Sequence, residues 1–166
     1  MFSAREPSDI DRFFRGLTEY AFHARLGVVD PPLVDYVALL LVRFLRHEAL
    51  VTPPAGPAGG ADVTTMLVAA RDHAPDEALA EYRHIGDYTL FWTGLYPEAV
   101  ERLSGSVRSG PVVDFRAAGK QAYWLVSVLE PDDAAEEREL FARLSRDYDL
   151  CAEGLAEVRR AWGDAA

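Results

Sequence analysis

The chain has 166 residues, a formal net charge of -10 and an apolar share of 49%, which are typical of a single-domain globular protein. A surface with this excess of acids repels phosphate backbones and anionic lipid headgroups. We therefore expect no nucleic acid and no membrane as a partner, and this leaves a protein partner or self-association.

The sequence also predicts a cytoplasmic protein. Its single cysteine, Cys151, excludes an internal disulfide and favours a reducing compartment. Residues 1–11 contain acids and no apolar core, so they do not form a secretory signal. The longest apolar run, residues 37–42, is too short to cross a bilayer.

The first part of the chain has the spacing of two helices. Ser8 precedes a run with an apolar residue at every third or fourth position and is predicted to cap it, and Gly27 is predicted to end it. Asp30, which is followed by two prolines, predicts a second helix start. In residues 33–45 apolar side chains cover nearly the whole circumference, which is typical of a central helix.

The remaining segments predict further helices separated by two flexible loops, 51–62 and 104–111. Helical spacing recurs in residues 63–70, 76–92, 97–103 and 115–129. Residues 132–162 keep the same spacing, and Asp149 could cap a break, so one helix or two remain open. Residues 110–115 are the only short β candidate.

These patterns predict an all-α fold. We expect a single helical domain over residues 1–166, built as an irregular bundle of six to eight helices around the segment 33–45.

One stretch, residues 83–98, carries the strongest functional pattern. Gly86 and Gly94 interrupt a predicted helix, and each costs roughly 1 kcal/mol relative to alanine. Small residues at this spacing allow another backbone or a flat ligand to come close. Asp87 lies in an apolar context, where a carboxylate must be paired, hydrogen-bonded or protonated.

Two interpretations of this stretch remain open. In the first, Asp87, Tyr88, Trp92 and Tyr123 line a ligand pocket, with His84 beside them. In the second, the glycines allow a tight helix crossing, and Asp87 caps a neighbouring helix or pairs with a buried arginine or tyrosine.

A metal site is a further candidate, because Glu81 and His84 form a Glu-x-x-His motif on one helical face. Carboxylate-bridged dimetal bundles need two such motifs and two further glutamates, whereas this sequence has one motif. A solvated helix face explains the pair equally well. We therefore predict no cofactor.

Common catalytic signatures are missing from the sequence, which has no nucleophile elbow, phosphate loop or dinucleotide fingerprint. Cys151 lies on an apolar helical stripe and is expected to be a small buried hydrophobe. The adjacent rings of Phe91-Trp92 and Tyr123-Trp124 point to different helix faces. One ring of each pair could therefore mark an interface, although core packing explains them as well.

The stretch from Gly86 to Glu98 resembles a group of uncharacterised bacterial helical proteins that share a Gly-Asp, a Leu-Phe, a Gly and a Pro-Glu at similar spacing. Residues 119–123 resemble a second shared patch. The resemblance covers about the central half of the chain. It implies a helical fold and a bacterial cytoplasmic setting, and it assigns no activity and no catalytic residue.

The sequence thus predicts a non-enzymatic helical module that assembles with itself or with a partner protein. The alternative is a small-molecule-binding or metal-binding helical protein, or an enzyme, with a site near Glu81, His84, Asp87, Tyr88 and Tyr123.

Overall fold

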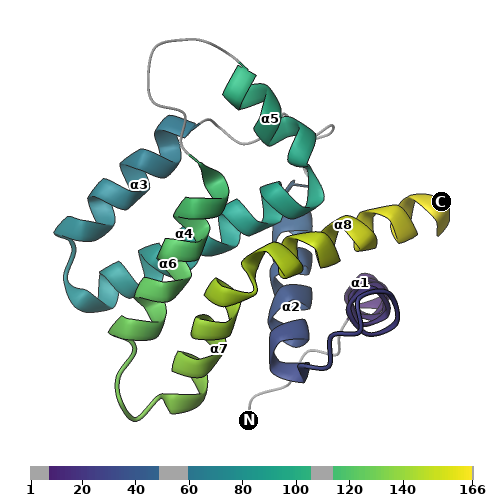
Figure 1. Ribbon diagram of the computed structural model, residues 1–166, viewed down its shortest axis with the longest axis horizontal. Helices are drawn as coiled ribbons and strands as arrows, with labels where there is room; N and C mark the ends of the chain where they lie inside the picture. The colour runs from purple at the N-terminus through teal and green to yellow at the C-terminus, as the bar shows by residue number, and fades with distance from the viewer. Residues whose placement is uncertain (1–7, 49–59, 106–113, 166) are drawn as a thin grey trace.

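The computed structural model describes residues 8–48, 60–105 and 114–165, and every regular element within them is helical (Figure 1). The α-helices are α1 (Asp9–Glu19), α2 (Pro31–Glu48), α3 (Gly60–Asp72), α4 (Pro75–Leu95), α5 (Pro97–Gly105), α6 (Phe115–Leu129), α7 (Ala135–Arg146) and α8 (Tyr148–Ala165). A π-helical segment, η1 (Tyr20–Arg25), continues α1. The helices pack into one bundle, which confirms the predicted all-α class.

Local interactions fix the first helix boundaries as the sequence predicted. The Ser8 hydroxyl accepts a hydrogen bond from the Asp11 N–H at 3.3 Å, and the Asp11 carboxylate accepts one from the Ser8 N–H at 3.0 Å. This reciprocal pair is a capping box. Gly27 ends the π-helical segment with a positive φ of 67°. Asp30 then accepts a hydrogen bond from the Leu33 N–H at 3.3 Å at the start of α2.

The two predicted loops are shorter than expected where the structure describes them. Residues 60–62 already belong to α3, and residues 104–105 still belong to α5. Residues 51–59 and 106–111 lie outside the described residues, as do residues 110–113 of the β candidate. The last two residues of that candidate, Asp114 and Phe115, are the N-cap and the first residue of α6.

Residues 132–162 contain two helices, and the break lies at Asp147. The Asp147 N–H donates to the Arg143 carbonyl at 2.7 Å and ends α7, and α8 begins with the next residue. Asp149, which the sequence offered as a cap, instead accepts hydrogen bonds from Arg116 at 2.8 Å and Lys120 at 2.6 Å. It therefore ties α8 to α6.

The most enclosed helix is α4, whereas residues 33–45 of α2, which the sequence predicts to be central, contact α1, α4 and α7. From Ile85 to Leu95 every residue except the half-buried Tyr88 is buried. Helices α2, α3, α5, α6 and α8 pack around α4 (Figure 1). On α2, by contrast, the Leu39 side chain is 61% exposed. A helix with apolar residues on all sides can be buried on all sides. Whether it is buried depends on how its neighbours are arranged.

Glycines allow the neighbours of α4 to approach closely. A Cβ atom on Gly86 would overlap the ring of Tyr123 from α6, and one on Gly94 would lie 2.7 Å from Leu155 Cβ of α8. The tight helix crossing proposed from the sequence is therefore present in the structure at both glycines.

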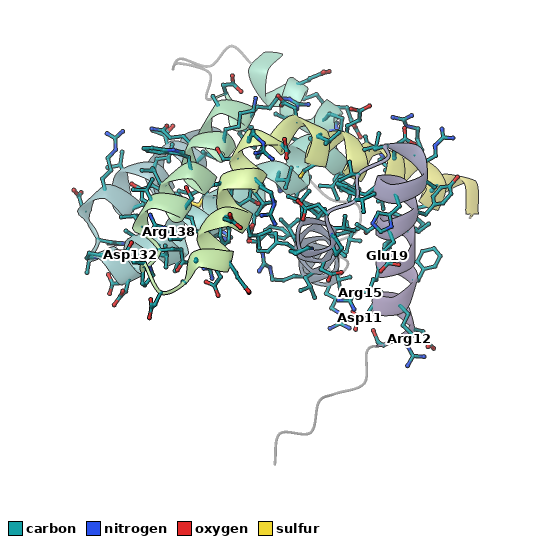
Figure 2. All side chains as sticks on the ribbon, turned by 60° about the horizontal axis from the view of Figure 1, so that its bottom comes forward. Asp11, Arg12, Arg15, Glu19, Asp132 and Arg138 are labelled. Carbon is teal, nitrogen blue, oxygen red and sulfur yellow. The ribbon has the colours of Figure 1, made fainter. Side chains whose placement is uncertain are left out.

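The turn from α6 to α7 is held by Arg138 (Figure 2). Its guanidinium donates to the Ser127 carbonyl at 3.2 Å and pairs with Asp132 at 2.5 Å. As a result α7 folds back along α6.

None of the helices in the described ranges combines the length and the apolar character that crossing a bilayer requires.

Candidate functional site

A buried carboxylate joins three helices at the position that the sequence singled out. The Asp87 side chain, on α4, is 2% exposed. Its Oδ1 accepts hydrogen bonds from the hydroxyls of Tyr36, on α2, and Tyr123, on α6, at 2.7 Å each. Its Oδ2 lies 2.5 Å from Nη2 of Arg43, on α2. We call these four residues the Asp87 cluster.

The electrostatics of the cluster favour protonated phenols beside the Asp87 carboxylate. Burial, together with the nearby Asp87 charge, raises the pKa of both Tyr36 and Tyr123 well above the usual value for tyrosine. Both hydroxyls therefore remain donors. Arg43 supplies the compensating positive charge, and its side chain stays 59% exposed, so the guanidinium keeps part of its hydration.

Little acceptor capacity remains on this carboxylate. An ionised aspartate offers roughly four lone-pair positions, and the three donors of the cluster already occupy most of them. Aromatic rings close the surroundings, because Phe141 lies 5.3 Å from the Tyr36 ring and 5.8 Å from the Tyr123 ring. The arrangement binds α2, α4 and α6 together and leaves the carboxylate enclosed.

A second polar contact lies two residues further along α4, at Thr89. The Tyr148 hydroxyl donates to Thr89 Oγ1 at 3.0 Å, and Thr89 in turn donates to the Ile85 carbonyl at 2.8 Å. Burial raises the pKa of Tyr148 above the usual tyrosine value, so this phenol also stays protonated. The hydrogen bond joins α8 to α4.

The four predicted ligand residues separate into different environments. Asp87 and Tyr123 meet directly, as described above. Tyr88 is half-buried, and its ring lies 6.1 Å from that of His84. Trp92 is 2% exposed, and its ring lies 5.5 Å from that of Tyr96. The pattern of contacts at Asp87 is the one expected from the second interpretation, pairing with arginine and tyrosine.

Sequence reasoning missed two members of the cluster, Tyr36 and Arg43. A signal for them was present, because they are separated by two helical turns and interrupt the apolar run 33–45 with polar groups. What the sequence lacked was any indication that this side of α2 would face Asp87.

The metal candidates Glu81 and His84 lie at the edge of the bundle. His84 is exposed, and its ring stacks on Phe44 with centroids 6.4 Å apart. Glu81 is half-buried. Within the described ranges of the chain, the structure contains no group of three histidine, cysteine, aspartate or glutamate side chains placed to hold a metal ion.

The single thiol is also enclosed. Cys151 is buried on α8, and burial, reinforced by the charge of Asp147, raises its pKa to about 12. The thiol therefore stays protonated at neutral pH, as expected for a small buried hydrophobe.

A groove of about 330 Å³ lies away from all these residues, between the end of α4, the start of α5 and the second half of α8. Its lining residues are Gly94, Leu95, Pro97, Ala156, Arg159, Arg160 and Gly163. The guanidinium of Arg159 donates to the Leu95 carbonyl at 2.9 Å and pairs with Glu98 at 2.6 Å. Arg160 pairs with Glu157 at 2.8 Å. Both cations of the groove are thus already paired.

The fold is an all-helical bundle in which the buried Asp87 carboxylate joins α2, α4 and α6. Neither a protein-family model nor a curated protein nor a solved structure matches this chain.

Proposed function

We propose that the protein is a non-enzymatic helical module that assembles with itself or with a partner protein. The observation that carries the proposal is a set of large apolar side chains left exposed on the helices, which comprises Ile10, Phe13, Tyr20, Leu39, Val68, Trp124, Val128 and Leu129. Scattered exposed apolar residues are ordinary, whereas residues that gather on one helix face mark interaction surfaces.

Two helix faces gather such residues. Trp124 and Val128 are one turn apart on α6 and share a face. Ile10, Phe13 and Tyr20 follow one another at helical spacing along α1 and η1. Both faces are directed away from the core of this bundle.

The environments of the Asp87 carboxylate and the Cys151 thiol support a role other than catalysis. The Asp87 carboxylate already accepts three hydrogen bonds from its own fold, and the Cys151 thiol is protonated and buried. The groups that the sequence offered for chemistry therefore contribute to packing.

A small-molecule or metal site near Glu81, His84 and Asp87 is the second candidate. The observation that favours it is the exposed His84, whose ring stacks on Phe44 and lies 6.1 Å from the tilted ring of Tyr88. The resemblance to the bacterial helical family adds a setting, the bacterial cytoplasm, and adds no reaction.

Light scattering coupled to size-exclusion chromatography tests the proposal over a dilution series. The expected result is a defined oligomer whose fraction rises with protein concentration. In parallel, the melting temperature is measured with divalent metal ions and with a set of metabolites. A strict monomer whose melting temperature rises with one metal or metabolite would contradict the assembly role and favour the second candidate.

A further inference from the structure

We propose that a second copy of this chain docks antiparallel on the exposed face of α6 and forms a symmetric dimer. This inference rests on the proposed function and names the surface that performs it. The surface, which we call the α6 face, consists of Ala117, Gln121, Trp124 and Val128.

The spacing of the α6 face is that of a helix-pairing seam. Its residues are separated by four, three and four positions, the alternation that two helices need to interlock along a common axis. All four are exposed, with 54% exposure at Trp124 and 50% at Val128. The opposite side of α6 packs against the core, where Ala118, Ala122 and Val126 are buried. The exposed seam is therefore a second packing face on a helix that already has one.

Charge favours α6 over the other helices as the place where a second copy can dock. The chain has a net charge of -10, so two copies repel each other over most of their surfaces. Among the α-helices in the described parts of the chain, α6 alone contains no aspartate or glutamate. Its two cations, Arg116 and Lys120, are held at the side by Asp149. Two copies that meet through α6 thus bring no acid of this helix against another.

The other apolar face lacks this property. Charged side chains run along α1, as Figure 2 shows for Asp11, Arg12, Arg15 and Glu19. Asp9 lies one turn before the exposed Phe13. A symmetric contact through α1 would therefore have to remove charged groups of both copies from water, which disfavours it relative to α6.

An antiparallel arrangement fits the order of residues on the α6 face. With the two-fold axis between residues 122 and 123, Ala117 faces Val128 of the other copy and Gln121 faces Trp124. In each pair the smaller residue then meets the larger one, and the cations at the start of the two helices lie at opposite ends. A parallel pair would instead place two Trp124 rings at one level and the four cations of Arg116 and Lys120 at one end.

The size of the face predicts a weak dimer that depends on salt. A helix of 15 residues is about 22 Å long, so the contact falls at the small end of specific interfaces. Repulsion between the acidic bodies acts over about 30 Å at 0.01 M salt and about 8 Å at 0.15 M. Dimerisation should therefore strengthen when salt is added, unlike an association driven by opposite charges.

Analytical ultracentrifugation of the full chain tests the surface. Relative to the unchanged chain, Trp124→Gln and Val128→Gln are each expected to weaken dimerisation at least about tenfold, the loss that corresponds to burial of one large apolar side chain. The matched control Leu39→Gln removes an equally exposed apolar side chain from α2 and should leave dimerisation unchanged. Helical circular dichroism verifies that each variant is folded.

The outcomes separate this inference from the proposed function. An oligomer that is indifferent to both α6 substitutions overturns the α6 face and leaves assembly in place. A chain that stays monomeric at every concentration and salt level would contradict the proposal that a second copy binds the α6 face. A monomer that also gains stability with one metal ion or metabolite overturns the assembly role as well.

Cysteine cross-linking tests the orientation. A chain with Ala117→Cys and a tagged chain with Val128→Cys should form a mixed disulfide when combined and should form none when each is oxidised alone. Ala142→Cys, on an exposed part of α7, serves as the control and should remain unlinked with either chain. Disulfides within each single variant, without a mixed product, would overturn the antiparallel arrangement.

Discussion

Two aspartates of this protein make contacts of nearly the same length in very different surroundings. Asp87 lies at 2.5 Å from Arg43 with a side chain that is 2% exposed, and Asp149 lies at 2.6 Å from Lys120 with a side chain that is 59% exposed. The difference teaches that distance alone does not measure what a contact contributes. The Asp87 carboxylate and the Tyr123 hydroxyl were removed from water on folding, so each needs its partner, whereas Arg43 stays 59% exposed. Around Asp149 water can replace either partner.

The largest expected effect comes from alkaline pH, because it acts on all the buried phenols at once. Tyr36, Tyr123 and Tyr148 have pKa values raised in the folded state. A raised pKa contributes stability that is complete below the unfolded value, about 10, and is lost as pH rises above it. Between the pKa of the unfolded chain and that of the folded chain, each phenol should lower the free energy of unfolding by about 1.4 kcal/mol per pH unit. Denaturant unfolding at increasing pH should show this decline, and flat stability above that pH would contradict the buried phenols.

Removal of the Asp87 carboxylate should destabilise the fold by about 2–5 kcal/mol, because each buried hydroxyl left without its acceptor costs roughly 1–3 kcal/mol. Asp87→Leu leaves the hydroxyls of Tyr36 and Tyr123 without their acceptor. Asp87→Asn keeps one acceptor oxygen and should cost less. Urea unfolding followed by circular dichroism measures both variants, and a leucine variant as stable as the unchanged chain would show that the contact is dispensable.

Gly86→Ala sharpens the comparison, because it displaces one phenol and leaves the carboxylate in place. The added methyl group would overlap the Tyr123 ring. We expect a loss of about 1–3 kcal/mol from overpacking, despite the better helix propensity of alanine. The control is Gly16→Ala on α1, where no atom lies within 4 Å of the new methyl group. That variant should be more stable by up to about 1 kcal/mol. In thermal or urea unfolding, the midpoints of the two variants should therefore shift in opposite directions.

Asp149→Asn should have the smallest effect, within about 1 kcal/mol, because exposed ion pairs are screened by water and salt. Lys120 and then Arg116 lower the pKa of Asp149 by hydrogen bonding, against the opposing effect of burial. A lowered pKa contributes stability that is present above the unfolded value and is lost as pH falls through the folded value. The stability difference between this variant and the unchanged chain should therefore shrink below about pH 4. A loss as large as that of Asp87→Leu would contradict the comparison.

Two pairs of adjacent aromatic residues show which features of burial can be predicted from the sequence and which cannot. Helical geometry requires that adjacent rings point to different faces, and this predicted that one ring of Tyr123-Trp124 could lie outside. In the structure Tyr123 is buried and Trp124 is exposed. Phe91 and Trp92 have the same arrangement in the sequence, yet both are buried. The difference arises because α4 is surrounded by other helices, whereas α6 has one side uncovered.

The sequence by itself determined the all-α class and most helix boundaries, because caps and helical spacing depend on residues within about four positions of each other. Ser8, Gly27 and Asp30 act at their own helix ends, and local chemistry suffices to identify them. It also identified Asp87 as a carboxylate that needs partners. Only the tertiary structure decided which partners these are, since Tyr36, Arg43 and Tyr123 are 51, 44 and 36 positions away. It likewise decided that α4 is enclosed and that one side of α6 is not, because both depend on how whole helices pack.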